Sequence, residues 1–244
     1  MQAVFIALFL AATTAATEPP AHMAGAGWLK THEKQVEIAR NQKVRVALVG
    51  DSLIAGWSKT SWEKTWAPRG AANFGIAGDR TEHVLWRLRN GLLEAIDPDV
   101  VLLQVGTNDI KSGDIRRSPA DTAAGIRAIV ETIRAAKPKA RIIVMAIFPR
   151  RPKYDWIDAA IQEANVRLAQ IQREMADVLV VDIGIHFRGQ NLQPSKVHLA
   201  DDLLHLKGSG YDIWTQCVVD AVDAVRPRKD GRQEDLPAGG TRQN

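Results

Sequence analysis

Cysteine is almost missing from this chain. Cys217 is the only cysteine among 244 residues, which excludes an intrachain disulfide and any metal site built from several cysteines. A single cysteine is compatible with an oxidising or a reducing compartment. Because Cys217 falls in a stretch with a helical pattern, we expect it to be a buried structural thiol.

The sequence also lacks internal repeats and a strong excess of one charge. Its formal net charge is +4, and residues 226–244 contribute +2 of this through five basic and three acidic side chains. The other basic residues are mixed with acidic ones and form no long stripe, so nucleic-acid binding is not expected. With 45% hydrophobic residues, the chain can bury one sizeable core, and its length allows one or two domains.

The two ends of the chain differ from its middle. Residues 1–17 carry no charged side chain and an apolar run that is too short for a typical membrane span, followed by Glu18-Pro19-Pro20. This pattern predicts a cleavable signal peptide, and hence a secreted or periplasmic protein without stable membrane insertion. A start at Met23 would instead give a cytoplasmic chain. Residues 226–244 lack periodicity, so we expect a disordered tail.

Residues 44–56 place a serine directly after a short apolar run. A β-branched run closed by glycine is typical of a buried strand in a parallel sheet. Ser52 should therefore lie at the C-terminal edge of that sheet, where open α/β sheets bind ligands. In that position Ser52 is either a helix cap or a nucleophile. The choice depends on whether other segments supply a base, an orienting carboxylate and oxyanion donors.

The rest of the chain alternates strand-like and helical segments. Strands are predicted over 44–49, 71–78 including a glycine loop, 100–105, 140–147 and 178–181, and helices within 21–43 and over 81–93, 118–136, 158–175 and 208–225. Ser118 and Pro119 are a typical N-cap and first helical residue. The alternation predicts one domain over residues 28–225, an α/β three-layer α/β/α sandwich with a flavodoxin-like five-stranded parallel sheet.

Aromatic and basic residues near the expected sheet edge have two interpretations each. Three tryptophans follow Ser52, namely Trp57, Trp62 and Trp66. Core packing is the favoured interpretation of this spacing, and a ring that lines a pocket is the alternative. Arg150 and Arg151 could attract an anionic substrate, but paired surface arginines are common. His83, on the helix predicted over 81–93, is expected to be structural rather than a catalytic base.

Near the end of the chain, Asp202 and His205 lie three residues apart. On one helical turn they would be neighbours, so Asp202 could accept a hydrogen bond from His205, as in the base and orienting half of a catalytic triad. Alone, this spacing is more typical of a surface pair. His186 and His198 could in principle replace His205, but neither follows a carboxylate at this spacing. Asp201 is the alternative to Asp202.

Four short blocks occur in order: G-D-S-L at 50–53, the glycine in N-F-G-I-A-G-D at 73–79, G-T-N-D at 106–109 and D-x-x-H at 202–205. Through these blocks the sequence resembles the SGNH, or GDSL, hydrolases. The phrases N-F-G-I-A-G-D-R-T-E-H-V-L-W-R-L-R-N-G and L-H-L-K-G-S-G-Y resemble the catalytic subunits of intracellular platelet-activating-factor acetylhydrolase. The resemblance covers about residues 44–225.

The resemblance implies a flavodoxin-like fold and a serine hydrolase that needs no metal or other cofactor. By motif position, Ser52 would be the nucleophile, His205 the general base and acid, and Asp202 the residue that orients the imidazole. The implied oxyanion donors are the backbone N–H groups of Ser52 and Gly78 and the side-chain amide of Asn108. Two simpler roles remain open: Gly78 could serve only a positive φ, and Asn108 only the loop.

We therefore expect a serine carboxylic ester hydrolase that cleaves short acyl esters, chiefly acetyl, through an acyl-enzyme intermediate. Asp51 should serve the turn rather than the chemistry. If the protein is exported, O-acetylated carbohydrates are the leading substrate class, with a lysophospholipase, a thioesterase or a lipid acetylhydrolase as the alternative. A catalytically silent glycan-binding protein is the alternative from another class. The resemblance also implies a homodimer.

Overall fold

The computed structural model describes residues 26–57, 61–110, 117–150, 156–175 and 177–225. The predicted signal peptide over 1–17, the alternative start at Met23, Arg151 and the predicted tail over 226–244 lie outside the described residues. The helices are α1 (Ala26–Arg40), α2 (Ser52–Ala55), α4 (Thr81–Arg87), α5 (Leu93–Ala95), α6 (Pro119–Ala136), α7 (Trp156–Glu174) and α8 (Gly208–Val225), with short turns η2 (Trp62–Trp66), η3 (Ala67–Arg69), η4 (Leu88–Leu92) and η5 (Gly184–Phe187).

A parallel sheet forms the centre of the molecule. Its strands are β1 (Val46–Gly50), β2 (Ala71–Gly75), β3 (Val100–Gln104), β4 (Arg141–Met145) and β5 (Val178–Val181). They are arranged in the order β2-β1-β3-β4-β5, with every neighbouring pair parallel. This is the flavodoxin-like order, so the prediction of the fold class is confirmed.

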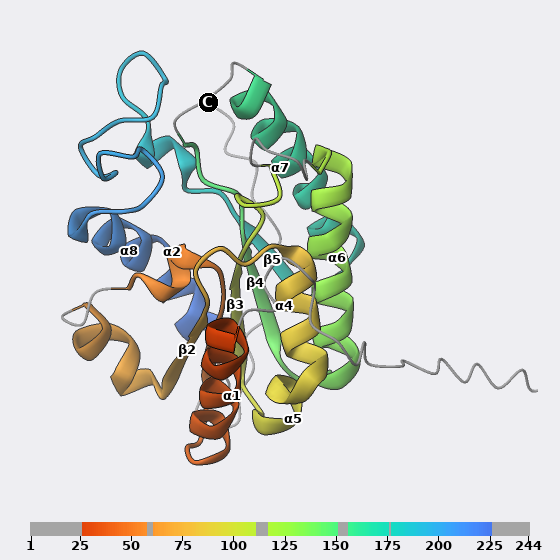
Figure 1. Cartoon of the computed structure of the whole chain (residues 1–244). Coiled ribbons are helices and arrows are strands. Elements are labelled where there is room, and N and C mark those ends of the chain that lie inside the picture. Colours follow the sequence, from red (N-terminus) through yellow and green to blue (C-terminus); the bar gives the residue numbers. More distant parts are fainter. Residues whose placement is uncertain (1–25, 58–60, 111–116, 151–155, 176, 226–244) are drawn as a thin grey trace, which may run out of the picture.

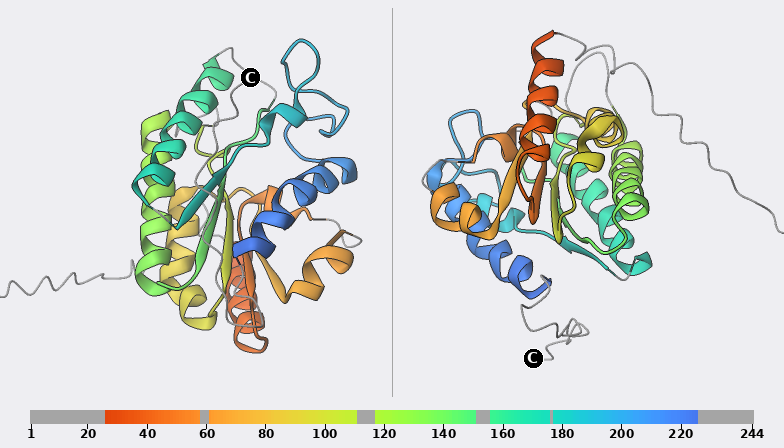
Figure 2. Two further views of the ribbon diagram at one scale, coloured as in Figure 1. Left: turned by 180° about the vertical axis from the view of Figure 1, so that it is seen from behind. Right: turned by 90° about the horizontal axis from the view of Figure 1, so that it is seen from below.

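Alternate residues of each central strand enter two different cores. Ala47 and Val49 of β1 pack with α4, α6 and α7, whereas Val46 and Leu48 pack with α2 and α8. Figure 1 shows α4, α6 and α7 on one side of the sheet and α2 and α8 on the other, and Figure 2 shows the same three layers from behind and from below. Both faces are covered, which explains why the strands are apolar without alternation.

Most predicted boundaries agree with the structure, and the cap of α6 is as expected. The hydroxyl of Ser118 accepts a hydrogen bond from the N–H of Asp121 at 3.0 Å. The helix predicted over 81–93 is not continuous, however. It breaks at Asn90 (φ −111°, ψ 60°) and Gly91 (φ 100°) in η4. Glycine tolerates this positive φ. The carbonyl oxygen of Asn90 lies 2.8 Å from Nε2 of His32 in α1, within hydrogen-bond distance.

The aromatic residues after Ser52 belong to the core, as predicted. Trp57 and Trp66 are buried, with ring centroids 5.1 Å apart in an edge-to-face arrangement. Trp57 also lies 4.5 Å from the ring of Trp214 in α8. Trp62 is partly buried against the same cluster. Cys217 is half-buried rather than fully buried, and this burial raises the pKa of its thiol.

The cap of α2 is Asp51, and Ser52 is the first residue of the helix. One carboxylate oxygen of Asp51 accepts the N–H of Leu53 at 2.9 Å, so this side chain serves the turn. The side chain is fully buried, and its second oxygen has no hydrogen-bond partner among the described residues. Burial, assisted by the charges of Asp79 and Asp109, raises the pKa of Asp51 to about 7.

This raised pKa predicts a pH-dependent stability. The folded protein holds the Asp51 proton up to a pH of about 7, whereas the unfolded chain loses it near the ordinary value of 3.8. The stability contributed by protonated Asp51 is therefore complete below pH 3.8 and is lost as pH rises through 7. Asn, which resembles the protonated acid and can still cap Leu53, avoids this loss. We expect the free energy of unfolding of Asp51→Asn to rise relative to wild type by about 3 kcal/mol between pH 5 and pH 8.

Urea unfolding at the two pH values measures this change. Asp97→Asn is the matched control, because the Asp97 side chain is 97% exposed. A difference between Asp51→Asn and wild type that is the same at both pH values would contradict the prediction.

Candidate active site

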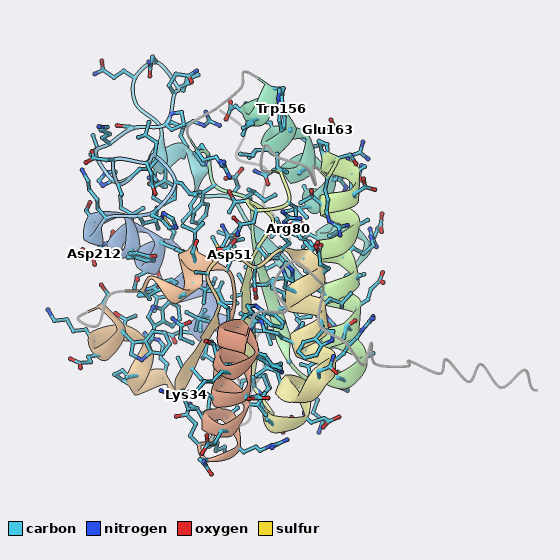
Figure 3. All side chains as sticks on the ribbon, in the orientation of Figure 1. Lys34, Asp51, Arg80, Trp156, Glu163 and Asp212 are labelled. Atoms are coloured by element: carbon cyan, nitrogen blue, oxygen red, sulfur yellow. The ribbon has the colours of Figure 1, made fainter. Side chains whose placement is uncertain are left out.

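Three neighbouring strands end at the same edge of the sheet. In the register of the sheet, Gly50 of β1 lies opposite Gly75 of β2 and Gln104 of β3. The segments that follow these strands carry Ser52, Gly78 and Asn108, so the parallel register brings all three to one place. Figure 3 shows Asp51, which precedes Ser52, and Arg80, which follows the loop of Gly78, at this edge.

Ser52, His205 and Asp202 form a continuous chain of hydrogen bonds. The Oγ atom of Ser52 lies 3.0 Å from Nε2 of His205, and Nδ1 of His205 lies 2.6 Å from Oδ2 of Asp202. Ser52 is half-buried, whereas the His205 and Asp202 side chains are 45% and 49% exposed. In this arrangement an imidazole oriented by a carboxylate can take a proton from the serine hydroxyl, and water can reach the site.

The segment that carries Asp202 and His205 is not the helical turn expected from their spacing. The N–H of Ala200 donates to the carbonyl of His205 at 2.7 Å, and Leu203 has a φ of 51°. The other oxygen of Asp202 accepts the backbone N–H groups of Leu204 and His205, both at 3.0 Å. An aspartate whose side chain accepts hydrogen bonds from the backbone N–H groups two and three residues later favours a turn over a helix. The pair therefore meets across a tight loop.

The same contacts determine the ionisation of Asp202. Partial burial alone would raise its pKa. The hydrogen bonds from the His205 ring, the His205 N–H and the Leu204 N–H outweigh burial and hold the pKa of Asp202 below its ordinary value. Asp202 is thus an ionised acceptor for the imidazole at neutral pH.

Each of the three expected oxyanion donors has an N–H group that donates to no protein acceptor among the described residues. In the described part of the chain, the backbone N–H groups of Ser52 and Gly78 donate to no protein acceptor. Gly78 has a φ of 83°, which favours glycine. The Asn108 amide uses one N–H to donate to the carbonyl of Asp79 at 2.9 Å and retains a second. Asn108 therefore supports the loop and can still donate to an oxyanion.

The alternative candidates lie elsewhere or have other partners. His186 is exposed in η5, and Nδ1 of His198 contacts the hydroxyl of Ser209 at 3.1 Å. Asp201 is paired with Lys196 at 3.0 Å. His83 is fully buried, and its Nδ1 accepts the N–H of Arg80 at 2.8 Å, so it caps α4 as a structural residue.

Arg150 is half-buried rather than a fully exposed surface residue. Its guanidinium donates to the carbonyl of Thr107 at 3.0 Å, directly before Asn108. Burial lowers the pKa of Arg150, while the charge of Asp202 acts in the opposite direction. Its position three residues after the predicted strand over 140–147 indicates the same edge of the sheet.

Asp109, the last residue of the G-T-N-D block, is fully buried, and no local sequence pattern predicts a role for its side chain. Its carboxylate accepts the hydroxyl of Thr81 at 2.6 Å and the N–H of Thr81 at 3.1 Å, so it joins the loop after β3 to the start of α4. Burial raises the pKa of Asp109 to about 6. The last residue of the G-T-N-D block thus supports the position of Asn108.

The described ranges contain no group of three or more His, Cys, Asp and Glu side chains arranged to hold a metal ion. Nor does any helix in those ranges have the length and apolar composition needed to cross a membrane.

Comparison with known proteins gives consistent results. The model of the GDSL-like Lipase/Acylhydrolase family matches residues 48–213. The chain is 35% identical over 188 residues to Platelet-activating factor acetylhydrolase IB subunit alpha2 of Rattus norvegicus, covering 75% of this chain and 78% of that protein.

Two crystal structures show the same fold. A GDSL-like lipase from Bacteroides thetaiotaomicron has a TM-score of 0.66 at 21% identity, covering 79% of this chain and 97% of that one. Axe2, an acetylxylan esterase from Geobacillus stearothermophilus, has a TM-score of 0.58 at 18% identity, covering 74% and 94%. At these identities the likeness supports the fold alone. The family match and the 35% identical relative carry the further conclusion that this chain belongs to the GDSL-like lipase/acylhydrolase family of carboxylic ester hydrolases.

Proposed function

We propose that this protein is a serine esterase that hydrolyses acetyl and other short acyl esters through an acyl-enzyme intermediate. The observation that carries the proposal is the hydrogen-bonded chain from Ser52 through His205 to Asp202, with distances of 3.0 and 2.6 Å. A serine hydroxyl is a weak nucleophile at neutral pH, and a base within hydrogen-bond reach is what activates it.

In the proposed reaction, Ser52 Oγ attacks the ester carbonyl while Nε2 of His205 takes the hydroxyl proton. The oxyanion accepts hydrogen bonds from the Ser52 and Gly78 N–H groups and from the second N–H of Asn108. The C–O bond to the alcohol then breaks, and the alcohol leaves with the proton from His205. Water, deprotonated by the same imidazole, hydrolyses the acyl-serine and restores the hydroxyl. Asp202 stays ionised and orients the imidazole.

The short acyl group is supported by the similarity to an acetylhydrolase subunit at 35% identity. The alcohol portion is less constrained. If the predicted signal peptide is cleaved, an exported enzyme would meet O-acetylated carbohydrates, and we place these first. A lipid acetyl ester of the kind named in the relative is the alternative, as are lysophospholipids and thioesters.

A silent glycan-binding protein on this scaffold is the competing function. Such a protein would not need a base, an orienting carboxylate and unpaired N–H donors around one serine. The intact arrangement therefore favours catalysis.

Substitution of Ser52 separates these two functions. Ser52→Ala should lower the rate of p-nitrophenol release from p-nitrophenyl acetate by about 10⁶-fold, because it removes the nucleophile and leaves only the donors. Ser118→Ala is the matched control. It removes a serine that caps α6, so it should cost about 1 kcal/mol of stability and leave the rate unchanged. Equal rates for wild type and Ser52→Ala would reject the esterase.

The preferred length of the acyl chain is a separate prediction. Across p-nitrophenyl esters from acetate to decanoate, kcat/KM should be highest for acetate and fall as the acyl chain lengthens. A maximum at the long end would replace the acetylesterase with a lipase-like enzyme. An acetate-release screen on acetylated sugars, polysaccharides and lipids then identifies the alcohol.

Export is a separate prediction that rests on residues 1–17. N-terminal sequencing of the mature protein from its host should find the chain beginning at about Ala15 to Thr17 or just beyond. A retained Met1 would refute cleavage. The homodimer implied by the resemblance stays a prediction.

A further inference from the structure

Asp79, the residue after Gly78, ties the loop between β2 and α4 to its surroundings. Its buried carboxylate accepts Nε1 of Trp28 in α1 at 2.7 Å and contacts Arg87 of α4 at 2.7 and 2.8 Å. Its backbone carbonyl accepts the Asn108 amide at 2.9 Å. One residue thus fixes the position of Gly78 in the chain and receives a hydrogen bond from Asn108, the side-chain donor expected at the oxyanion.

Arg87 links Asp79 to the strand that delivers Ser52. Its guanidinium donates to the carbonyl of Gly50 at 3.1 Å, to the carbonyl of Phe74 at 2.9 Å and to the Gln35 side chain at 3.2 Å. With two contacts to Asp79, this gives a partner for each of its five N–H groups. Gly50 is two residues before Ser52, and Phe74 is four residues before Gly78. The guanidinium therefore connects the ends of β1 and β2 with the loop.

The energetics of this cluster favour a role beyond stability. The Arg87 and Asp79 side chains are both 0% exposed, and burying a charge pair carries a desolvation penalty that its attraction only partly offsets. Well-packed apolar residues often stabilise a fold equally well. The planar Arg87 guanidinium instead fixes the relative positions of its partners, because each N–H group specifies where one acceptor must lie.

We propose that Asp79, Arg87 and Trp28 are positioning residues that hold the oxyanion donors Gly78 and Asn108 in register with Ser52. The inference rests on the proposed function. It gives α1 an indirect part in catalysis, through the hydrogen bond from Trp28 to Asp79. Gln35 of α1 strengthens this link, since its side chain donates to the carbonyl of Gly75 at 2.9 Å.

Trp28→Phe is the most informative variant. Substituting Asp79 would leave the buried charge of Arg87 unpaired and could unfold the protein. Trp28→Phe removes the Nε1–H donor together with one ring of the indole, and keeps a six-membered ring beside Trp86, whose centroid lies 5.5 Å from that of Trp28. Trp66→Phe is the matched control. Trp66 is buried, and its Nε1 has no hydrogen-bond partner in the part of the chain that the structure describes.

With p-nitrophenyl acetate, Trp28→Phe should lower kcat about 10-fold with KM unchanged, because a displaced donor weakens binding of the transition state more than binding of the substrate. Asn108→Ala, which deletes a donor, should cost about 10²–10³-fold. In the Asn108→Ala background, Trp28→Phe should have a smaller effect than in wild type, because both changes act on the same oxyanion site. Trp66→Phe should leave kcat unchanged.

A second readout does not depend on activity. The side-chain ¹⁵N–¹H resonances of Asn108 should shift in Trp28→Phe and stay in place in Trp66→Phe. Unchanged resonances together with unchanged kcat would overturn the positioning role, as would equal losses of kcat in both tryptophan variants. Failure of the proposed function has a different signature, namely equal rates for wild type and Ser52→Ala, and in that case the resonances alone decide the inference.

Discussion

Close packing of backbone at one edge of the sheet is the constraint on which the site depends. A Cβ atom at Gly50 would lie 1.9 Å from the carbonyl oxygen of Gln104, and one at Gly75 would lie 2.3 Å from the nitrogen of Ala55. Such distances leave no room for a side chain, so glycine allows β1, β2, β3 and α2 to converge. The segments that leave this edge carry Ser52, Gly78 and Asn108, which is why the proposed site draws on three separate loops.

Around this edge the acidic residues have opposite electrostatic environments. Asp202 is half exposed and accepts three N–H groups, which keeps its pKa low. Asp51 and Asp109 are buried, and their pKa values rise to about 7 and about 6. The Asp202 carboxylate is therefore ionised at neutral pH beside His205. The buried carboxylates of Asp51 and Asp109 instead accept hydrogen bonds that hold their loops in place. Aspartate takes both roles, ionised acceptor and buried structural residue, because the exposure of the carboxylate to water and its hydrogen bonds set its pKa.

Local patterns predicted much of the fold. Apolar runs located the strands, a Ser-Pro pair located the start of α6, and the alternation of strands and helices gave the layer order. The errors occurred where tertiary contacts decide the outcome. Gly91 breaks the helix where α1 packs against it, and Asp202 draws its loop into a turn. Arg150 is half-buried because its guanidinium binds the loop after β3, a contact that no local pattern records.

Local sequence is enough to identify the available groups: Ser52 after a strand, Gly78 and Asn108 after two others, and a carboxylate three residues before His205. These assignments depend on motif order and strand position, which are local properties. Long-range packing brings Nε2 of His205 to Ser52 across 153 residues and brings Arg87 and Trp28 together at Asp79. Contacts of this kind depend on how helices pack on the sheet, and that packing is a property of the whole core rather than of any segment.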